Sequence, residues 1–373
     1  MKITGAGILN AASPLTIRAF STFPAVINLS GGRILASYRV GSSKDCDDET
    51  IEVRESEDLG LTWSEPRSPF PPFSENENRY SLKLVYFTLL PEGRLLATAM
   101  AVDRTAYPSR PLFNEVTQGC LPMRILLSES TNGGRTWEPW RAIDTPTDIG
   151  PPSLTSPLLH LADGRLAISI ESNKSYLDSS PWLQKVTYLF SDDGGRRWGN
   201  PVVVAQDPAG SIFNWDQRAG VTPDGVVVTF TWVFDSEAGV YHNIWKRYSV
   251  DGGASWSSPE DLGFADQPSH PAIFPDGRIV LAWVDHFGTQ TIRARAARSY
   301  REPFEISSET VLYESHTRNE GKTGLGESLD EMSRWAYGLP FTHALPNGEV
   351  FVVYYAGSPT GTGVYWVRLA LEE

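Results

Sequence analysis

The chain has 373 residues, of which 40% are hydrophobic and 11% aromatic, and it contains 32 glycines and 27 prolines. Its formal net charge of −13 argues against nucleic acid as a partner, since phosphate binding needs a basic surface. No apolar run approaches the length that crosses a bilayer, and we interpret residues 1–15 as mature sequence rather than a secretory signal. Cys46 and Cys120 lie in separate parts of the chain, so no disulfide framework is expected and a cytoplasmic location is predicted.

A hairpin pattern recurs along the chain: an apolar run, a tight turn that ends in glycine, and a second apolar run. Turns such as Pro-Asp-Gly and Pro-Asn-Gly between β-rich runs are typical of hairpins. The six copies cover residues 27–36, 88–97, 159–168, 220–229, 273–282 and 344–353, and their turn glycines are Gly32, Gly93, Gly164, Gly225, Gly277 and Gly348. Each hairpin is expected to supply the first two strands, A and B, of one repeating unit.

A second motif, which we call the Trp box, follows four of the hairpins. The copies are SEDLGLTW (56–63), STNGGRTW (130–137), SDDGGRRW (191–198) and SVDGGASW (249–256). An aspartate in the third position can accept hydrogen bonds from turn N–H groups, and the following glycine can take a positive φ. The final tryptophan is expected to bury its ring under the turn. The boxes are therefore assigned a structural role, as the turns between strands C and D.

Repetition of units made of short strands is typical of a β-propeller. We predict an all-β fold, a six-bladed β-propeller of four-stranded antiparallel blades, as a single domain over residues 1–373. The units begin near residues 21, 79, 150, 212, 266 and 335, and a strand over residues 13–20 is expected to close the ring. The A–B turns and Trp boxes share one end of such blades. The long B–C loops and the starts of the A strands share the other end, where the functional pocket is expected.

The Trp boxes resemble the Asp-box, or bacterial neuraminidase, repeats of the sialidase superfamily, and the six units match that family's propeller. The resemblance covers nearly the whole chain. It places Arg39 and Asp45, 17 and 11 residues before Ser56, as the family's first-blade arginine and its aspartic acid/base. It places Asp216, nine residues before Gly225, where the family has a glutamate that polarises a tyrosine nucleophile.

The tyrosine nucleophile implied by the resemblance lies near the start of the last A strand. Tyr337 follows Ala336 there, as the family's tyrosine often follows alanine. It stands 11 residues before Gly348, whereas Leu339 fills the family's usual place nine residues before that glycine. Tyr337 is therefore the candidate nucleophile, at a shifted position.

The arginines that hold the carboxylate of sialic acid are only partly matched. Sialidases use three, because a planar guanidinium pairs bidentately with a carboxylate. Thr22 and Trp232 occupy two of these positions, and Arg318 or Arg334 could supply the third. The resemblance therefore implies a substrate other than ordinary sialic acid.

Other residues at the predicted functional end complete the candidate site. The candidate substrate-binding residues are Arg39, Asp47, Arg218, Trp232, His270, His286 and Arg334, and the candidate catalytic residues are Asp45, Asp216, Tyr337 and Glu171. The acidic run around Asp45 lacks a calcium-loop pattern, so neither a metal nor a cofactor is expected.

The predicted function is that of an exo-acting glycoside hydrolase on an oligosaccharide or glycoside. Asp45 is the expected general acid/base, kept protonated by its acidic neighbours in an exposed loop. Tyr337 with Asp216, or else Glu171, attacks the sugar or activates water. Two alternatives stay open: a polysaccharide lyase that uses His270 or His286 with a tyrosine beside a uronate, and a non-catalytic glycan-binding propeller.

Overall fold

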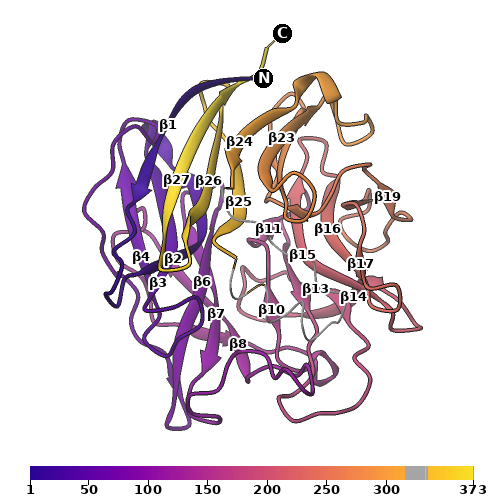
Figure 1. Ribbon diagram of the computed structural model, residues 1–373. Helices are drawn as coiled ribbons and strands as arrows, with labels where there is room; N and C mark the ends of the chain where they lie inside the picture. The colour runs from indigo at the N-terminus through magenta and orange to yellow at the C-terminus, as the bar shows by residue number, and fades with distance from the viewer. Residues whose placement is uncertain (316–331, 333–334, 373) are drawn as a thin grey trace.

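The computed structural model describes residues 1–315, 332 and 335–372, and its regular secondary structure is almost entirely β-strand (Figure 1). These strands pair into one seven-stranded and four five-stranded sheets, so the all-β expectation is confirmed. The helical segments named within the described residues are three short 3-10 turns: η1 (Ser30–Gly32), η2 (Thr147–Ile149) and η3 (Ile306–Ser308). In the same part of the chain, no helix has the length and apolar character needed to cross a membrane.

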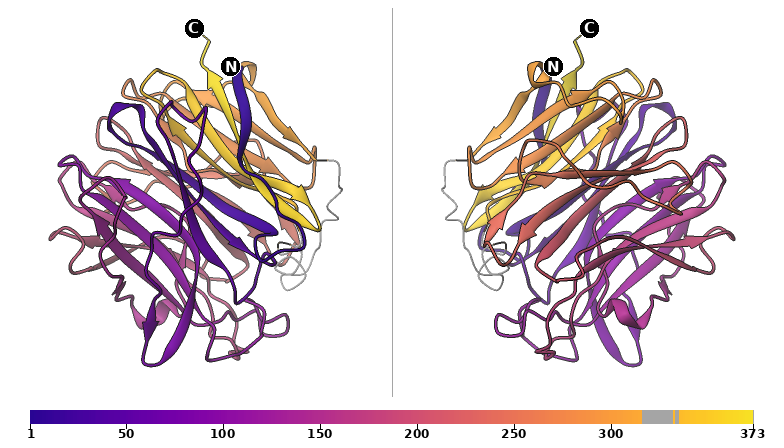
Figure 2. Two further views of the ribbon diagram at one scale, coloured as in Figure 1. Left: turned by 90° about the vertical axis from the view of Figure 1, so that its left-hand side faces the viewer. Right: turned by 90° about the vertical axis from the view of Figure 1, so that its right-hand side faces the viewer.

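The largest sheet contains both ends of the chain. Its strands are β1 (Lys2–Asn10), β2 (Phe20–Asn28), β3 (Ile34–Gly41), β4 (Thr50–Ser56), β25 (Tyr337–Ala344), β26 (Val350–Ser358) and β27 (Gly361–Ala370). It consists of two antiparallel groups, β2-β3-β4 and β25-β26-β27-β1, joined by one parallel pair between Phe20 and Thr362. Strand β1 runs antiparallel to β27, so the N-terminus lies near the end of the last strand (Figures 1 and 2).

The N-terminal strand does not occupy the residues that we expected. Residues 14–19 form turns, and the strand that pairs with β27 is Lys2–Asn10. The reason is local: Thr16 Oγ1 donates to Ser13 O at 2.7 Å, and Ala19 N donates to Thr16 O at 3.1 Å. These short-range bonds and Pro14 fold the segment back on itself, so it cannot extend along the sheet.

Each of the other four sheets is built around one predicted hairpin. The second contains β5 (Ser74–Glu75), β6 (Asn78–Leu89), β7 (Leu95–Asp103), β8 (Met123–Ser130) and β9 (Arg141–Ile143); the third contains β10 (Ser153–Leu154), β11 (Leu159–His160), β12 (Leu166–Glu171), β13 (Lys185–Ser191) and β14 (Gly199–Gln206). The fourth contains β15 (Ile212–Val221), β16 (Val227–Asp235), β17 (Val240–Tyr241), β18 (Trp245–Ser249) and β19 (Glu260–Asp261); the fifth contains β20 (Gln267–Pro268), β21 (Ala272–Ile273), β22 (Ile279–Asp285), β23 (Thr291–Ala297) and β24 (Thr310–Glu314). Neighbouring strands in these sheets are antiparallel, as hairpin connections require.

The hydrogen bonds predicted for the Trp boxes are present. In the first box, Asp58 Oδ1 accepts from the N–H groups of Leu61 and Thr62 at 3.0 and 2.8 Å. Ser56 Oγ accepts from Gly60 N at 2.8 Å, and Gly60 has a φ of 89°. In the second and third boxes Asn132 and Asp193 each accept from the two corresponding N–H groups, and in the fourth box Asp251 accepts from Ser255 N. The four box tryptophans are half-buried.

Arginines tie three of the four box turns to the preceding sheet. Arg67 donates to the carbonyl of Gly134 at 2.7 Å, and Arg141 donates to that of Gly195 at 2.6 Å. In the next pair of sheets, Arg165 donates to the carbonyl of Gly252 at 3.0 Å. The boxes therefore connect neighbouring sheets as well as closing their own turns.

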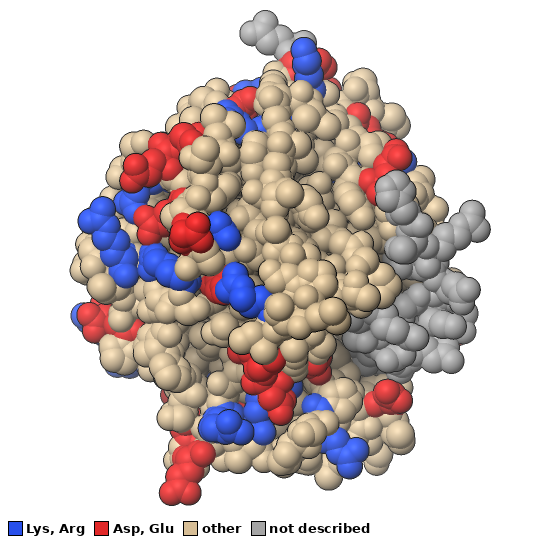
Figure 3. Space-filling view, turned by 60° about the vertical axis from the view of Figure 1, so that its left-hand side comes forward, with Lys and Arg blue, Asp and Glu red and all other residues tan. Residues whose placement is uncertain are grey.

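On the face shown in Figure 3, acidic and basic side chains are intermingled, and a broad band between them carries no charge.

Three of the hairpin strands contain a bulge at the same position. The register breaks between Thr22 and Ala25 in β2, between Trp215 and Arg218 in β15, and between Gly338 and Phe341 in β25. The bulged residues Phe23, Asp216 and Leu339 have φ values of 51°, 47° and 46°. A bulge removes its residue from the regular alternation of the strand and re-aims its side chain. All three side chains line one cavity.

Candidate functional site

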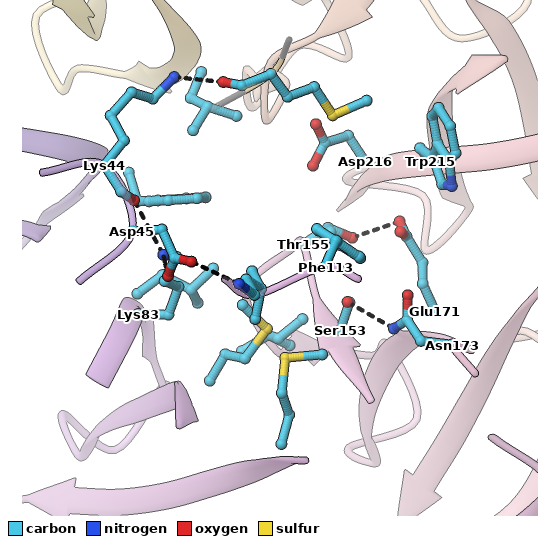
Figure 4. A pocket seen from close by; sticks show the side chains of 18 of the residues that line it. Lys44, Asp45, Lys83, Phe113, Ser153, Thr155, Glu171, Asn173, Trp215 and Asp216 are labelled. Atoms are coloured by element: carbon cyan, nitrogen blue, oxygen red, sulfur yellow. Dashed lines mark hydrogen bonds and ion pairs between the residues drawn. The ribbon is translucent and has the colours of Figure 1, made fainter. Parts of the chain in front are cut away.

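The cavity has a volume of about 260 Å³ and is lined mainly by apolar side chains. Its aromatic lining residues are Phe23, Tyr86, Phe113, Trp182, Trp215, Trp232, Trp335 and Tyr355, and its other apolar lining residues are Leu84, Met100, Pro111, Leu112, Met123, Leu154, Met332 and Leu339. The charged lining residues are Lys44, Asp45, Lys83, Glu115, Glu171 and Asp216, and the neutral polar ones are Ser153, Thr155, Asn173 and Gln267. In close-up, Asp45 lies on one side of the cavity and Glu171 and Asp216 on the other (Figure 4).

A fixed distance along the sequence accounts for much of this lining. The residue nine positions before the hairpin glycine lines the cavity in five of the six units: Phe23, Leu84, Thr155, Asp216 and Leu339. In the remaining unit that residue is Pro268, and its neighbour Gln267 lines the cavity instead. We applied the offset to only two units in the sequence, so Phe23, Leu84 and Thr155 were missed.

Asp45 reaches the cavity from the loop between β3 and β4, where two cations hold it. Its Oδ1 atom lies 3.1 Å from Lys83 Nζ and 2.9 Å from Arg104 Nη2, and its Oδ2 atom accepts from Leu112 N at 2.6 Å. Burial alone would raise the pKa of Asp45, but the charges of Lys83 and Arg104 outweigh it and hold the pKa below its usual range. The expectation that acidic neighbours keep Asp45 protonated is therefore wrong.

Behind Asp45 lies a buried network centred on Glu49. Its carboxylate accepts from Arg39 Nε at 2.6 Å, from Arg104 Nη2 at 2.7 Å and from Lys83 Nζ at 3.2 Å. Arg39 is fully buried in this network and does not line the cavity, contrary to its predicted substrate-binding role. Asp47 also lies away from the cavity, 3.8 Å from Arg104 Nε with a half-exposed side chain.

Glu171, at the end of β12, is a buried carboxyl group that lines the cavity. Its Oε1 atom accepts from Thr155 Oγ1 at 3.0 Å and from Gln217 N at 2.9 Å. Burial and the nearby charge of Asp216 raise the pKa of Glu171 to about 8, against the smaller opposing effects of these hydrogen bonds. Glu171 is therefore protonated at neutral pH.

Asp216 projects from the bulge of β15 and is held from two sides. Arg218 Nη2 lies 3.4 Å from its Oδ1 atom, and Gln267 Nε2 donates a short hydrogen bond to its Oδ2 atom. Gln267 Oε1 in turn lies 3.2 Å from His286 Nε2. Because Gln267 uses its amino group on Asp216, its carbonyl faces His286, whose Nε2 must then carry the hydrogen. Arg218 and His286 thus position Asp216 from behind the cavity wall.

The last A strand places a leucine, and not the predicted tyrosine, at the cavity. Tyr337 is fully buried at the start of β25, where its ring packs against those of Tyr313 and His286 at 5.5 and 5.6 Å between centroids. Leu339, displaced by the bulge, lines the cavity in its place. Tyr337 lies two residues before the family's usual position in the sequence, and in the structure it lies correspondingly outside the cavity. Tyr355 on β26, which the sequence analysis did not single out, is the tyrosine of this unit that lines the cavity.

The remaining predicted residues fall into three groups. Trp232 lines the cavity as expected. His270 is stacked on Phe341 at 4.4 Å between centroids, and burial lowers its pKa well below the usual value; like His286, it does not line the cavity. Arg334 and Arg318 lie outside the described residues. Within the described ranges, no group of three or more His, Cys, Asp or Glu side chains is arranged to hold a metal ion.

Two lysines at the cavity were not predicted, and both are fully engaged. Lys44 Nζ donates to Met332 O at 2.7 Å, to Trp335 O at 2.8 Å and to the Tyr355 hydroxyl at 3.1 Å. Lys83 Nζ donates to Lys44 O at 3.1 Å as well as to Asp45 and Glu49. Lys44 could have been found as the neighbour of Asp45. Lys83 gives no such signal, because it lies 38 residues beyond Asp45 in the chain.

Comparison with known proteins shows similarity in structure but not in sequence. No protein-family model and no curated protein matches the chain. A protein of unknown function from Dyadobacter fermentans superposes with a TM-score of 0.75 at 21% identity, over 99% of this chain and 100% of that one. An α-L-arabinanase from Penicillium chrysogenum gives a TM-score of 0.67 at 16% identity, covering 100% of this chain and 99% of the other.

An intramolecular trans-sialidase from Ruminococcus gnavus is similar over the whole chain as well. Its TM-score is 0.63 at 13% identity, covering 100% of this chain and 98% of that one. At these levels of identity the similarity concerns the fold. The chain therefore shares its all-β architecture with sialidases and an arabinanase.

Proposed function

We propose that the protein is an exo-acting glycoside hydrolase with the architecture of a six-bladed, sialidase-like β-propeller over residues 1–373. Six hairpin units and four Trp-box turns with the same hydrogen bonds support this architecture. The observation that carries the function is a protonated Glu171 beside Asp216 in one cavity. Glycoside cleavage needs two carboxyl groups in opposite protonation states, which this arrangement supplies.

Glu171 is the general acid in this proposal. Burial and the charge of Asp216 keep its proton on at neutral pH, so it can deliver that proton to the leaving glycosidic oxygen. This assignment replaces the predicted acid, Asp45, whose pKa is held below the usual range by Lys83 and Arg104.

Asp216 is the second carboxylate, acting as nucleophile or as the base that activates water. Its bulge aims it into the cavity, and Arg218 and Gln267 fix both of its oxygens. Asp45 suits another task, because a carboxylate of such low pKa is a poor base. Lying across the cavity and remaining ionised, it stabilises the positive charge that develops on the sugar ring in the transition state (Figure 4).

The size of the cavity supports exo action. At about 260 Å³ it lies below the range of about 300–1,000 Å³ that is usual for sites of drug-sized ligands. A terminal sugar unit fits such a volume, whereas several units of a chain do not. The lyase alternative has less support, because neither His270 nor His286 lines the cavity.

The test is Glu171→Gln, assayed on a panel of aryl glycosides and short oligosaccharides with the wild-type protein as reference. Removal of a positioned general acid is expected to lower the rate about 10²–10⁴-fold. In the wild-type protein, kcat/KM is expected to fall as pH rises through about 8, because Glu171 then loses its proton. This alkaline limb should be absent from the residual activity of the variant.

Glu52→Gln is the matched control, since Glu52 and Glu171 are both 5% exposed. Glu52 accepts a hydrogen bond from the Tyr38 hydroxyl at 3.1 Å and does not line the cavity, so its loss affects stability and not the rate. Near-normal turnover by Glu171→Gln would exclude Glu171 as the acid. An unsaturated product that absorbs in the ultraviolet would identify a lyase instead.

A further inference from the structure

The charged groups of the cavity limit the class of sugar that it can hold. Four carboxyl groups line it, from Asp45, Glu115, Glu171 and Asp216. Among the described residues, the cationic side chains of the lining are Lys44 and Lys83. Within the described lining, these two ammonium groups are the cationic partners with which a substrate carboxylate could pair.

Neither ammonium group has a hydrogen left to donate. An ammonium carries three donors, and Lys44 uses them on two backbone carbonyls and the Tyr355 hydroxyl. Lys83 uses its three on Lys44 O, Asp45 and Glu49. Burial, together with the charges of Arg39 and Lys83, also lowers the pKa of Lys44 well below its usual value, which weakens it as a partner for an anion.

The rest of the wall suits an uncharged ring. Trp182, Trp215, Trp232 and Trp335 present apolar surface, against which the C–H faces of a sugar can pack. Asn173 and Ser153 lie together at one side and offer neutral groups for hydroxyls; Asn173 Nδ2 lies 2.9 Å from Ser153 Oγ (Figure 4). A buried carboxylate without a partner is costly, whereas an apolar ring face gains from such contact.

We infer that the cavity binds an uncharged terminal sugar and excludes uronic and sialic acids. The inference rests on the proposed function for its substrate class, but it concerns binding and can be tested without catalysis. The charged groups that a carboxylate meets among the described lining residues are carboxyl groups and engaged lysines, whereas a neutral ring meets the tryptophan side chains.

The test uses methyl glycosides that differ only at C5. One series is xylose, 6-deoxyglucose, glucose and glucuronate, and the other has the corresponding galactose configuration. A panel of further neutral and acidic monosaccharides, sialic acid included, covers other configurations. Binding is followed by quenching of tryptophan fluorescence and by calorimetry on wild-type protein and on Glu171→Gln. Trp215→Leu tests the wall, with Trp256→Leu in a Trp box as its control and melting curves for all variants.

The neutral members are expected to bind at least about tenfold more tightly than the uronate of the same series, because one unpaired buried charge costs that much or more. Their affinity should not change with salt, since no ion pair forms. Trp215→Leu should weaken this binding, whereas Trp256→Leu should not. Equal or tighter binding of the uronates or sialic acid would overturn the inference, as would a panel in which no sugar binds.

These outcomes separate the inference from the proposed function. Neutral sugars that bind without being released from any glycoside would leave the substrate class standing and refute the hydrolase. Turnover of uronides that depends on Glu171 would support the hydrolase and refute the inferred preference for an uncharged sugar.

Discussion

The Trp boxes and the cavity are built by opposite means. Each box is closed by hydrogen bonds within eight residues of chain, as in residues 56–63, where Asp58 and Ser56 satisfy the turn. The cavity takes its charged side chains from two loops, from β6, from β12 and from β15, which are far apart in the sequence. Repeated local hydrogen bonds therefore build the scaffold of the sheets, whereas single, non-repeated residues build the cavity.

This difference has an energetic side. A box side chain is partly exposed, and its contribution is a few hydrogen bonds at the surface. Asp45 and Glu49 are held instead by three buried cations, and Glu171 is a buried acid beside a second carboxylate. Substitutions at the cavity should therefore alter activity and stability strongly, and substitutions in a box should alter stability weakly.

The largest effect is expected for Asp216→Asn, which removes one carboxylate of the cavity. Loss of the nucleophile or base should lower the rate about 10²–10⁴-fold. The charge of Asp216 helps to raise the pKa of Glu171, so the pKa of Glu171 should fall in the variant. The alkaline limb of the residual activity should therefore move below pH 8. An unchanged limb in a variant of reduced rate would mean that the two carboxyl groups do not interact.

The next effect is that of Asp45→Asn. The substitution leaves Lys83 and Arg104 without one of their carboxylate partners, so the free energy of unfolding should fall by about 1–3 kcal/mol, together with the rate. This differs from the sequence-based expectation that Asp45 lies in an exposed loop, where its loss would break no buried contact. The control is Asp48→Asn in the same loop, because Asp48 is exposed and accepts hydrogen bonds from Ser42, outside the buried network. Equal unfolding curves for the two variants would show that the buried network does not depend on Asp45.

The sequence was informative where the chemistry is local or the spacing is regular. The hairpins, the box hydrogen bonds and the presence of Asp45, Asp216 and Glu171 at one cavity followed from motif and offset. The pKa of Asp45 did not, because it depends on Lys83, which a bulge and a separate strand bring to the loop. Tyr337 failed because it lies two residues before the bulge position, nine residues ahead of Gly348, which Leu339 occupies. Long-range pairing and bulges are the features that a single sequence leaves undetermined.

The smallest effect is expected in a box, and it tests the other side of the comparison. Asp58 accepts four hydrogen bonds, from Ser56 Oγ, Leu61 N, Thr62 N and Thr62 Oγ1, at 2.6 to 3.0 Å. Despite the opposing effect of burial, the bonds from Thr62 and its neighbours lower the pKa of Asp58 to about 2. Asp58→Ala should therefore reduce stability by about 0.5–2 kcal/mol at neutral pH, as loss of a comparable capping side chain does, with kcat unchanged.

The adjacent Glu57→Ala is the control for this prediction, because Glu57 is exposed and removing it deletes a carboxyl group one residue away. The pH dependence supplies the second readout. A depressed pKa in the folded state means that the stabilisation is complete above about pH 4 and is lost as pH falls through about 2. The difference between Asp58→Ala and the wild-type protein should therefore shrink toward pH 2, while that of Glu57→Ala stays small throughout. A loss of activity in Asp58→Ala at unchanged stability would show that the box turns take part in function. It would contradict the assignment of a purely structural role to the boxes.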